Sequence, residues 1–147
     1  MMVAHEQDAL ERLLIPRQIL SEMQQYCERE KTVEVCGLLG GVGEFAQSFY
    51  PTKNIAEDPS HGYLMDPEEQ IQAMDLMRQR REQLLGIFHS HPNSAAEPSP
   101  TDLALAAYPG VAYLIASLKN DEATFRSFLF TGKQFEKLPL VLAESAG

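Results

Sequence analysis

The sequence predicts an α/β protein in which one mixed β-sheet is flanked by helices. The chain has 147 residues, the length of one domain, and 44% of them are hydrophobic, enough for a single packed core. Segments with helical periodicity alternate with several short β-rich segments, which favours an α/β or α+β arrangement around one sheet. We therefore expect a single domain over residues 1–147, with a core at about 13–142, ragged termini and a free tail over residues 143–147.

The first third of the chain predicts a strand, a helix and two further strands. Residues 13–15, Leu-Leu-Ile, favour a short strand, and Pro16 suits the first turn of a helix. Apolar residues with i, i+3, i+4, i+7 spacing then predict an amphipathic helix over 16–30. The segment TVEVCGLLGG, from Thr32, predicts a buried strand, and the glycines at its end predict a turn into a second strand over 45–50.

A second helix is predicted after a loop over residues 51–65. Asp66 is suited to cap this helix, Pro67 to occupy its first position, and Glu69 supplies a carboxylate three residues after the cap. We expect Gly86 to close the helix.

The remaining chain predicts a strand, a short helix and three more strands. Residues 84–91, LLGIFHSH, favour a strand that Pro92 terminates. The segment Ser99-Pro-Thr-Asp102 is another helix start, and we expect that helix to run through Ala107. The segments VAYLIASL, TFRSFLF and QFEKLPLVL predict the three final strands.

Composition argues against several classes of partner. The net charge of −9 repels phosphate backbones, and the basic cluster of Arg78, Arg80 and Arg81 lies where a helix dipole favours cations, so we expect no nucleic-acid binding. No apolar run approaches the roughly 18–20 residues of a membrane span, and the N-terminus lacks the features of a signal peptide. We therefore expect no membrane contacts. The two cysteines, Cys27 and Cys36, cannot form a disulfide framework, so we expect a reducing, cytoplasmic setting.

Two histidines near the end of the 84–91 strand are candidate metal ligands. His89 and His91 occupy alternate positions, so their side chains should point to one face, with Cα atoms about 6.6 Å apart. Two imidazoles at that separation can converge on one zinc ion, since zinc–nitrogen bonds are about 2.0–2.1 Å. The alternative is a pair of histidines that hydrogen-bond to backbone or water at the end of a strand.

Asp102 is a candidate for the third ligand. Ser99 and Asp102 together are also a helix N-cap with its reciprocal carboxylate, and capping alone would account for them. The two interpretations are compatible, because a capped first turn can still present the Asp102 carboxylate. Two histidines and one aspartate with a fourth position open is the layout of catalytic zinc sites.

Glu34 is the candidate proton acceptor for a water activated by such a metal. It interrupts the apolar segment VEVCGLLGG, where a charged side chain is costly to bury without a partner. The alternative is that Glu34 points to solvent from the edge of a strand. Cys36 follows two residues later and could face the same pocket, although a buried structural thiol is the simpler interpretation.

These segments together resemble the JAMM (MPN-plus) zinc metallopeptidase family. The resemblance rests on EVCGLLGG, which begins at Glu34, on His-Ser-His-Pro, and on Ser-x-x-Asp in the spacing His-x-His-x(7)-Ser-x-x-Asp. It extends over roughly residues 13–130 and is greatest to the small bacterial stand-alone members, the sulfur-carrier (CysO-cysteine-like) peptidases. It implies the JAMM/MPN fold, a mixed sheet flanked by helices of the cytidine-deaminase-like kind.

The resemblance also implies the role of each polar residue. His89, His91 and Asp102 would bind one zinc ion per chain. Glu34 would take the proton of the attacking water and pass it to the departing amine, and Ser99 would donate a hydrogen bond to the oxyanion.

The implied activity is hydrolysis of an amide or isopeptide bond after the C-terminal glycine of a ubiquitin-like or sulfur-carrier protein, with cysteine a plausible leaving group. The short stretch after Asp102 favours a stand-alone enzyme. Two alternative functions would involve no catalysis. A non-catalytic MPN-type scaffold or binding module would have lost the metal ligands, and a metal-storage protein would be expected to close its coordination.

Overall fold

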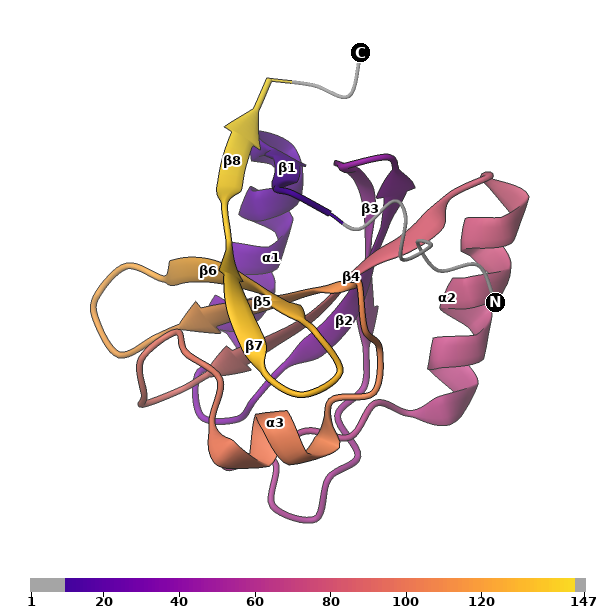
Figure 1. Ribbon diagram of the computed structural model, residues 1–147. Helices are drawn as coiled ribbons and strands as arrows, with labels where there is room; N and C mark the ends of the chain where they lie inside the picture. The colour runs from indigo at the N-terminus through magenta and orange to yellow at the C-terminus, as the bar shows by residue number, and fades with distance from the viewer. Residues whose placement is uncertain (1–9, 145–147) are drawn as a thin grey trace.

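The computed structural model describes residues 10–144, and the eight strands in this range form one mixed sheet (Figure 1). The elements are β1 (Leu13–Pro16), α1 (Arg17–Arg29), β2 (Cys36–Val42), β3 (Phe45–Thr52), α2 (Pro67–Gln79), β4 (Gln83–His91), α3 (Pro100–Leu105), β5 (Ala112–Ser117), β6 (Thr124–Phe130), β7 (Phe135–Leu138) and β8 (Leu140–Ala143). The strand order is β7-β6-β5-β4-β2-β3-β1-β8. The β1–β3, β1–β8 and β4–β5 pairs are parallel and the others antiparallel, so the predicted mixed sheet is confirmed.

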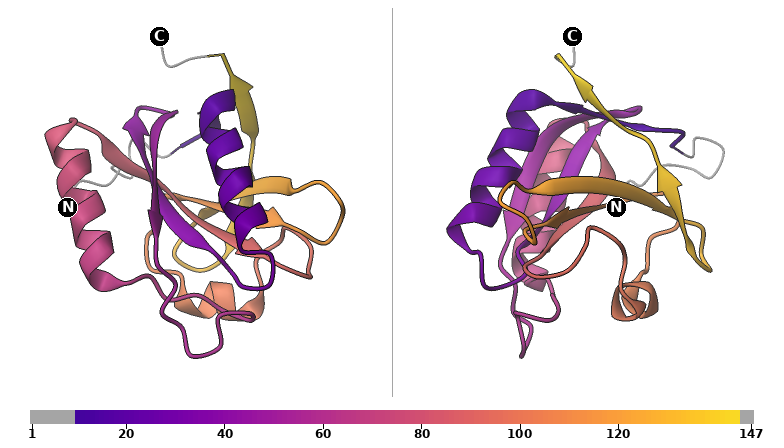
Figure 2. Two further views of the ribbon diagram at one scale, coloured as in Figure 1. Left: turned by 180° about the vertical axis from the view of Figure 1, so that it is seen from behind. Right: turned by 90° about the vertical axis from the view of Figure 1, so that its left-hand side faces the viewer.

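The two long helices cover opposite faces of the central strands (Figure 2). Helix α1 buries Ile19, Met23 and Cys27, which are spaced four residues apart, in one hydrophobic cluster. Helix α2 buries Ala73 and Met77 in a second cluster. No helix in the described part of the chain is both long enough and apolar enough to cross a membrane.

Strand β4 lies in the middle of the sheet and contributes to both clusters. Leu85 and Phe88 pack in the cluster of α1, whereas Leu84 and Ile87 pack in that of α2. Ile87, His89 and His91 occupy alternate positions, so both histidines extend from the sheet face that α2 covers. The core thereby fixes which way the histidines point.

The predicted end of the second helix is wrong. Helix α2 ends at Gln79 rather than at Gly86, because Arg81 adopts a left-handed conformation, with φ of 58°. The amide of Arg81 donates to the Arg78 carbonyl and that of Glu82 to the Met77 carbonyl, which is the bonding of a Schellman motif. This motif ends the helix without a glycine and leaves Gly86 inside β4.

The C-terminal segment QFEKLPLVL forms two strands rather than the predicted one. Pro139 separates β7 from β8, and these strands lie at opposite ends of the strand order. Since proline has no amide proton, it cannot continue a ladder, whereas its carbonyl accepts from the Leu13 amide. Ala143 pairs with Pro16 and so is not part of a free tail, and residues 145–147 lie outside the described residues.

Two other boundaries differ from the predictions. Helix α3 ends at Leu105, two residues before Ala107, because Ala106 is extended, with φ of −65° and ψ of 131°. Strand β2 begins at Cys36, so Glu34 lies in the segment before the strand and not within it.

Gly41 marks a place where two backbones come too close for a side chain. The register of β2 against β3 shifts between Gly40 and Gly41. A Cβ atom on Gly41 would lie 1.9 Å from the Phe45 carbonyl oxygen and 2.7 Å from a Leu85 methyl carbon. The β2–β3 hairpin therefore requires glycine at this position.

We expect Gly41→Ala to lower the free energy of unfolding by about 1–3 kcal/mol, because the added methyl group overlaps backbone that cannot move aside. Gly62→Ala is the matched control, since a Cβ atom there meets nothing within 4 Å, and we expect it to change stability by less than about 0.5 kcal/mol. Urea unfolding measures both; equal losses in the two variants would contradict the packing argument.

Candidate metal centre

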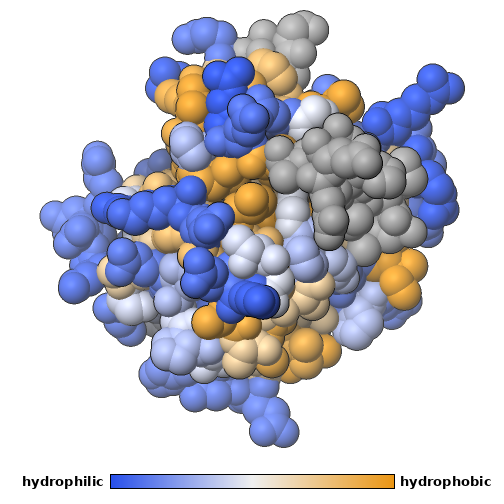
Figure 3. Space-filling model, in the orientation of Figure 1, coloured by the Kyte–Doolittle hydropathy of each residue, from blue (hydrophilic) through white to orange (hydrophobic). Residues whose placement is uncertain are grey.

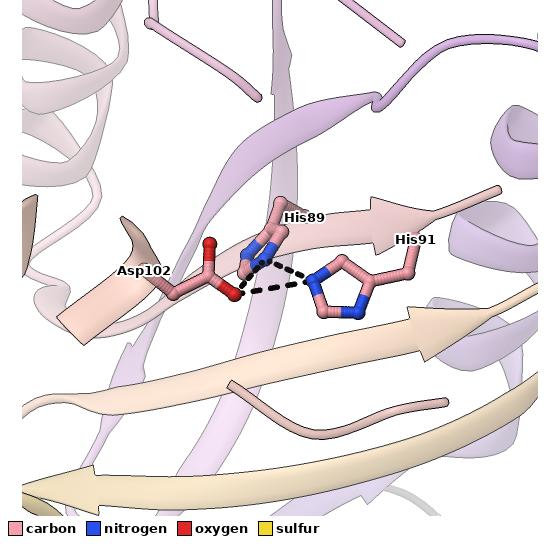
Figure 4. A group of neighbouring side chains, drawn as sticks. All are labelled: His89, His91 and Asp102. Carbon is pink, nitrogen blue, oxygen red and sulfur yellow. Dashed lines mark hydrogen bonds and ion pairs between the residues drawn. The ribbon is translucent and has the colours of Figure 1, made fainter. Parts of the chain in front are cut away.

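Three side chains from two elements converge at one end of β4 (Figure 4). The Nε2 atoms of His89 and His91 are 3.1 Å apart, and the Oδ2 atom of Asp102 lies 3.2 Å and 3.1 Å from them respectively. A tetrahedral site with bonds of about 2.0–2.1 Å has edges of about 3.3–3.4 Å. The three donor atoms therefore have nearly the mutual spacing that one zinc ion requires.

Asp102 is held in this position by the start of α3. The Ser99 side chain accepts from the Asp102 amide at 3.0 Å, while Asp102 Oδ2 accepts from the Ser99 amide at 2.9 Å. These reciprocal bonds are a capping box, with Pro100 at the first helical position. The structure thus combines the two interpretations of this segment: the first turn is capped, and the same carboxylate meets both histidines.

The hydrogen bonds and the burial of the three residues favour a neutral His89 and an ionised Asp102, whereas they favour the protonated form of His91. His91 Nδ1 lies 2.8 Å from the Ala95 carbonyl, so this nitrogen carries a proton and Nε2 is the atom whose lone pair could bind a metal. Burial would lower the pKa of His91, but the hydrogen bonds with Asp102 and the Ala95 carbonyl raise it, so a bound cation would have to displace a proton from Nε2. Burial lowers the pKa of His89, which keeps its imidazole neutral. Burial would raise the pKa of Asp102, but the close contacts with the His89 and His91 imidazoles outweigh it and hold that pKa well below its usual range.

Glu34 is buried beside this group, which contradicts the interpretation that it faces solvent. Its exposure is 7%, and burial raises the pKa of its carboxyl group to about 7, against a smaller opposite effect of His91. Strand β2 pairs antiparallel with β4, with Cys36 opposite His89, and this register brings the segment before β2 to the histidine end of β4.

Within residues 10–144, two buried side-chain polar atoms lack a hydrogen-bond partner, and both belong to this centre. They are Oε1 of Glu34 and Nδ1 of His89. Buried polar atoms are normally paired, because an unpaired one loses its bonds to water without replacement. An unpaired carboxylate oxygen with a raised pKa next to a set of metal-ligand atoms is typical of a functional site.

The sequence did not indicate three other residues at this centre. The ring of Tyr63 stacks on His89, with centroids 4.5 Å apart and planes at 22°. Ser90, between the two histidines, is fully buried, and its hydroxyl accepts from the Val35 amide at 2.9 Å. Ala95 supplies the carbonyl that orients His91. Only Ser90 had a local signal, as a polar residue in a buried strand.

The other residues considered from the sequence are not part of the group of three metal-ligand atoms. Cys36 is buried against Thr52, as expected of a structural thiol, and burial raises its thiol pKa to about 11. His61 is exposed and hydrogen-bonds with Asp58. His5, to which no role was assigned, lies outside the described residues.

The arrangement can hold a divalent metal with one position left open. Two imidazole nitrogens and one carboxylate oxygen suit zinc, and three protein ligands are the number found in catalytic zinc sites rather than in closed structural ones. A nearby group that can accept a proton near neutral pH suits general base chemistry.

Comparison with solved structures assigns the fold to the JAMM/MPN class. A JAB1/MPN domain protein from Archaeoglobus fulgidus is 19% identical, with a TM-score of 0.57 over 88% of this chain and 99% of that one. A second structure, described as JAMM, a metalloprotease-like zinc site in the proteasome and signalosome, has a TM-score of 0.56 at 18% identity over 88% of this chain and 98% of that one. The solution structure of a Desulfitobacterium hafniense protein is more similar, with 34% identity and a TM-score of 0.81 over 90% of this chain and 93% of that one.

The chain belongs to the family of prokaryotic homologues of the JAB domain, whose model matches residues 16–130. The desampylase of Haloferax volcanii is 31% identical over 84% of this chain and 88% of its own length. The CysO-cysteine peptidase of Mycobacterium tuberculosis is 29% identical over 74% of this chain and 75% of its own length. A probable TtuB-protein conjugate cleaving protease of Thermus thermophilus is 35% identical over 65% of this chain and 64% of its own length. The resemblance seen in the sequence is confirmed, and two of these relatives are named as a peptidase and a protease.

We expect zinc to stabilise the folded protein and His89→Ala to abolish this effect. At a zinc concentration 100 times Kd, binding adds about 2.7 kcal/mol, or roughly 5–10 °C in Tm for a chain of this size. His61→Ala is the matched control, because His61 is exposed and lies outside the ligand group, and it should keep the full shift. Thermal unfolding with and without zinc measures this; a shift that survives in His89→Ala would place the metal elsewhere.

Proposed function

We propose that this protein is a zinc-dependent peptidase or isopeptidase that hydrolyses the amide bond after the C-terminal glycine of a ubiquitin-like or sulfur-carrier protein. The observation that carries the proposal is the convergence of three metal-ligand atoms beside the buried, unpaired carboxylate of Glu34. The names of the relatives support the substrate class, since they describe cleavage of a TtuB-protein conjugate and of CysO-cysteine.

In this proposal His89, His91 and Asp102 hold the zinc, and Glu34 moves the proton. When bound, zinc acts as a Lewis acid that lowers the pKa of water to about 7 and polarises a carbonyl group. Glu34 accepts the proton of the attacking water on its carboxylate and returns it to the amine that departs. A pKa raised to about 7 by burial suits this exchange, because a general acid–base group works best when its pKa lies near the working pH.

Ser99 is the proposed donor to the oxyanion that forms at the scissile carbonyl. Its oxygen already accepts the Asp102 amide in the capping box, which leaves its hydroxyl proton available to donate. The cap fixes the position of the hydroxyl before substrate arrives, so little reorganisation is needed when charge develops.

The surface next to the centre supports a protein substrate. A pocket of about 240 Å³ lies beside Asp102, with Tyr63, Met65, Leu105 and Tyr108 in its lining. Leu105 is 69% exposed, and Figure 3 shows orange hydrophobic patches among polar side chains near the place that α3 occupies in Figure 1. Exposed apolar side chains rimmed by polar ones are typical of protein contact sites.

The leaving group separates two forms of this activity. We expect the protein to cleave a carrier–cysteine adduct, a lysine-linked carrier conjugate, or both. Mass spectrometry of the carrier C-terminus measures the cleavage of each. Processing of neither would contradict the proposal.

We place the reaction in the cytoplasm, where free thiols such as the buried Cys27 and Cys36 remain reduced.

We expect Glu34→Gln to lose at least about 100-fold in kcat while it still binds one zinc ion per chain, because the amide is nearly isosteric but cannot accept the proton. Zinc content and turnover, measured on the same preparation, test this. A chain that takes up no zinc in its wild-type form would instead favour the non-catalytic scaffold.

We expect Ser99→Ala to lower kcat by about 10²–10³-fold, the usual effect of removing one oxyanion donor. The same change also removes the cap of α3, which typically costs about 1 kcal/mol of stability. Ser99→Thr keeps the hydroxyl and the cap and should retain most of the turnover. Equal rates for the alanine and threonine variants, with matched Tm, would show that the hydroxyl does not act on the substrate.

A further inference from the structure

The side chain of Asn54 uses its entire hydrogen-bonding capacity in the loop before α2. Its Nδ2 donates to the Glu34 carbonyl at 2.8 Å and to the Gly62 carbonyl at 3.0 Å. Its Oδ1 accepts from the Ala56 and Leu64 amides, each at 3.0 Å. A primary amide offers two donor protons and two lone pairs, so all four bonds of this side chain are made.

Glu34 depends on this loop because it precedes the first residue of β2. Its amide donates to the Pro59 carbonyl at 2.7 Å, and its carbonyl accepts from Asn54. Both backbone groups of Glu34 are thus bonded to the 53–65 loop rather than to a neighbouring strand. The Oε1 atom of Glu34 has no partner, so its carboxyl group is held in place mainly through the backbone.

The next residue ties this arrangement to the ligand strand. The Val35 amide donates to Ser90 Oγ at 2.9 Å, and the Ser90 amide donates to the Val35 carbonyl at 3.0 Å. Ser90 lies between the two histidines of β4. Glu34 is therefore fixed on one side by the loop that Asn54 organises and on the other by the segment that carries the metal-ligand atoms.

The same loop also reaches a ligand directly. Asn54 pairs with Met65 as an isolated β-bridge, which closes the loop at its base. Between these two residues, Tyr63 stacks on the ring of His89. One side chain thus organises a loop that contacts both the proposed base and one proposed zinc ligand.

We propose that Asn54 is a positioning residue for catalysis, which sets the location of Glu34 relative to His89 and His91; this rests on the proposed function. Aspartate has nearly the same shape but cannot replace it. The carboxylate introduced by Asn54→Asp would retain the two acceptor bonds. Its second oxygen, however, would face the carbonyl oxygens of Glu34 and Gly62 in place of two donated protons.

The first test compares Asn54→Asp and Asn54→Ala with Asp58→Ala. Asp58 is an exposed residue of the same loop whose carboxylate, within residues 10–144, hydrogen-bonds to the Ser60 and His61 side chains and not to Glu34, so it is the matched control. The readout is a carrier whose C-terminal glycine is joined to 7-amino-4-methylcoumarin, together with zinc content.

We expect both Asn54 variants to remain folded and to bind one zinc ion, and to lose about 10–100-fold in kcat, the usual effect of removing an outer partner at a metal site. KM should stay within about twofold, and Asp58→Ala should match the wild type. Unfolding of both Asn54 variants, or a change confined to KM, would overturn the positioning role.

A double-mutant cycle with Glu34→Gln separates positioning from a general loss of structure. Since Asn54 is proposed to act through Glu34, Asn54→Asp should add less than about twofold to the loss already present in Glu34→Gln. Multiplicative losses in the double variant would overturn the proposal.

Hydrogen exchange supplies a readout that needs no turnover. The Glu34 amide should be protected in the wild type and in Asp58→Ala, and should exchange at least about tenfold faster in Asn54→Asp, with the Ser90 amide unchanged. If the wild type cleaves no carrier, the proposed function fails, while exchange still reports on the link between Asn54 and Glu34. An unprotected Glu34 amide in the wild type would overturn that link.

Discussion

The centre depends on one carboxylate oxygen, Oδ2 of Asp102, which meets three nitrogen atoms at once. The Ser99 amide and the Nε2 atoms of both histidines lie 2.9–3.2 Å from it. The capping box supplies the first of these contacts, so the start of α3 also completes the group of three side chains that could hold a metal. A short helix of six residues can do this because its cap, rather than its length, determines its orientation.

The sheet supplies what the short helix cannot, a rigid base for the histidines. Strand β4 is bonded to β2 on one side and to β5 on the other, and its apolar residues fill the clusters on both faces. Only its last residues carry polar side chains into the interior. The two histidines therefore lie on a strand that is bonded on both sides, whereas Asp102 lies in the first turn of α3, where the capping box fixes its carboxylate.

Glu34 is buried in an environment that is unfavourable for its charged carboxylate, and the fold keeps it there. A buried carboxylate without a partner for Oε1 is unfavourable by itself, and the raised pKa is the electrostatic consequence. The surrounding bonds of Val35, Ser90 and Asn54 hold the backbone of this segment in the position from which the Glu34 side chain is buried. Such conflicts persist where the rest of a structure over-determines them, and they are concentrated at functional sites.

Sequence alone determined the features that neighbouring residues encode. The alternation of His89 and His91, the Ser99–Asp102 cap and the starts of α2 and α3 follow from local periodicity and capping chemistry, and the structure bears out each of them. Pro16, predicted in the first turn of the first helix, is instead the last residue of β1 and the N-cap of α1. The end of α2 was missed because a left-handed Arg81 replaces the usual glycine. Pro139 was a local signal for the split of the last strand, but the pairing of its two halves at opposite ends of the sheet is not encoded locally.

Only the tertiary structure decided which distant residues meet. The pairing of Cys36 with His89 brings the segment of Glu34 to the metal-ligand atoms, and the loop organised by Asn54 covers it. Whether a glutamate between two valines faces water or the interior depends on strand register, and register is set by burial of the whole core. Contacts between residues far apart in the chain carry no periodic signal, so their geometry had to come from the fold.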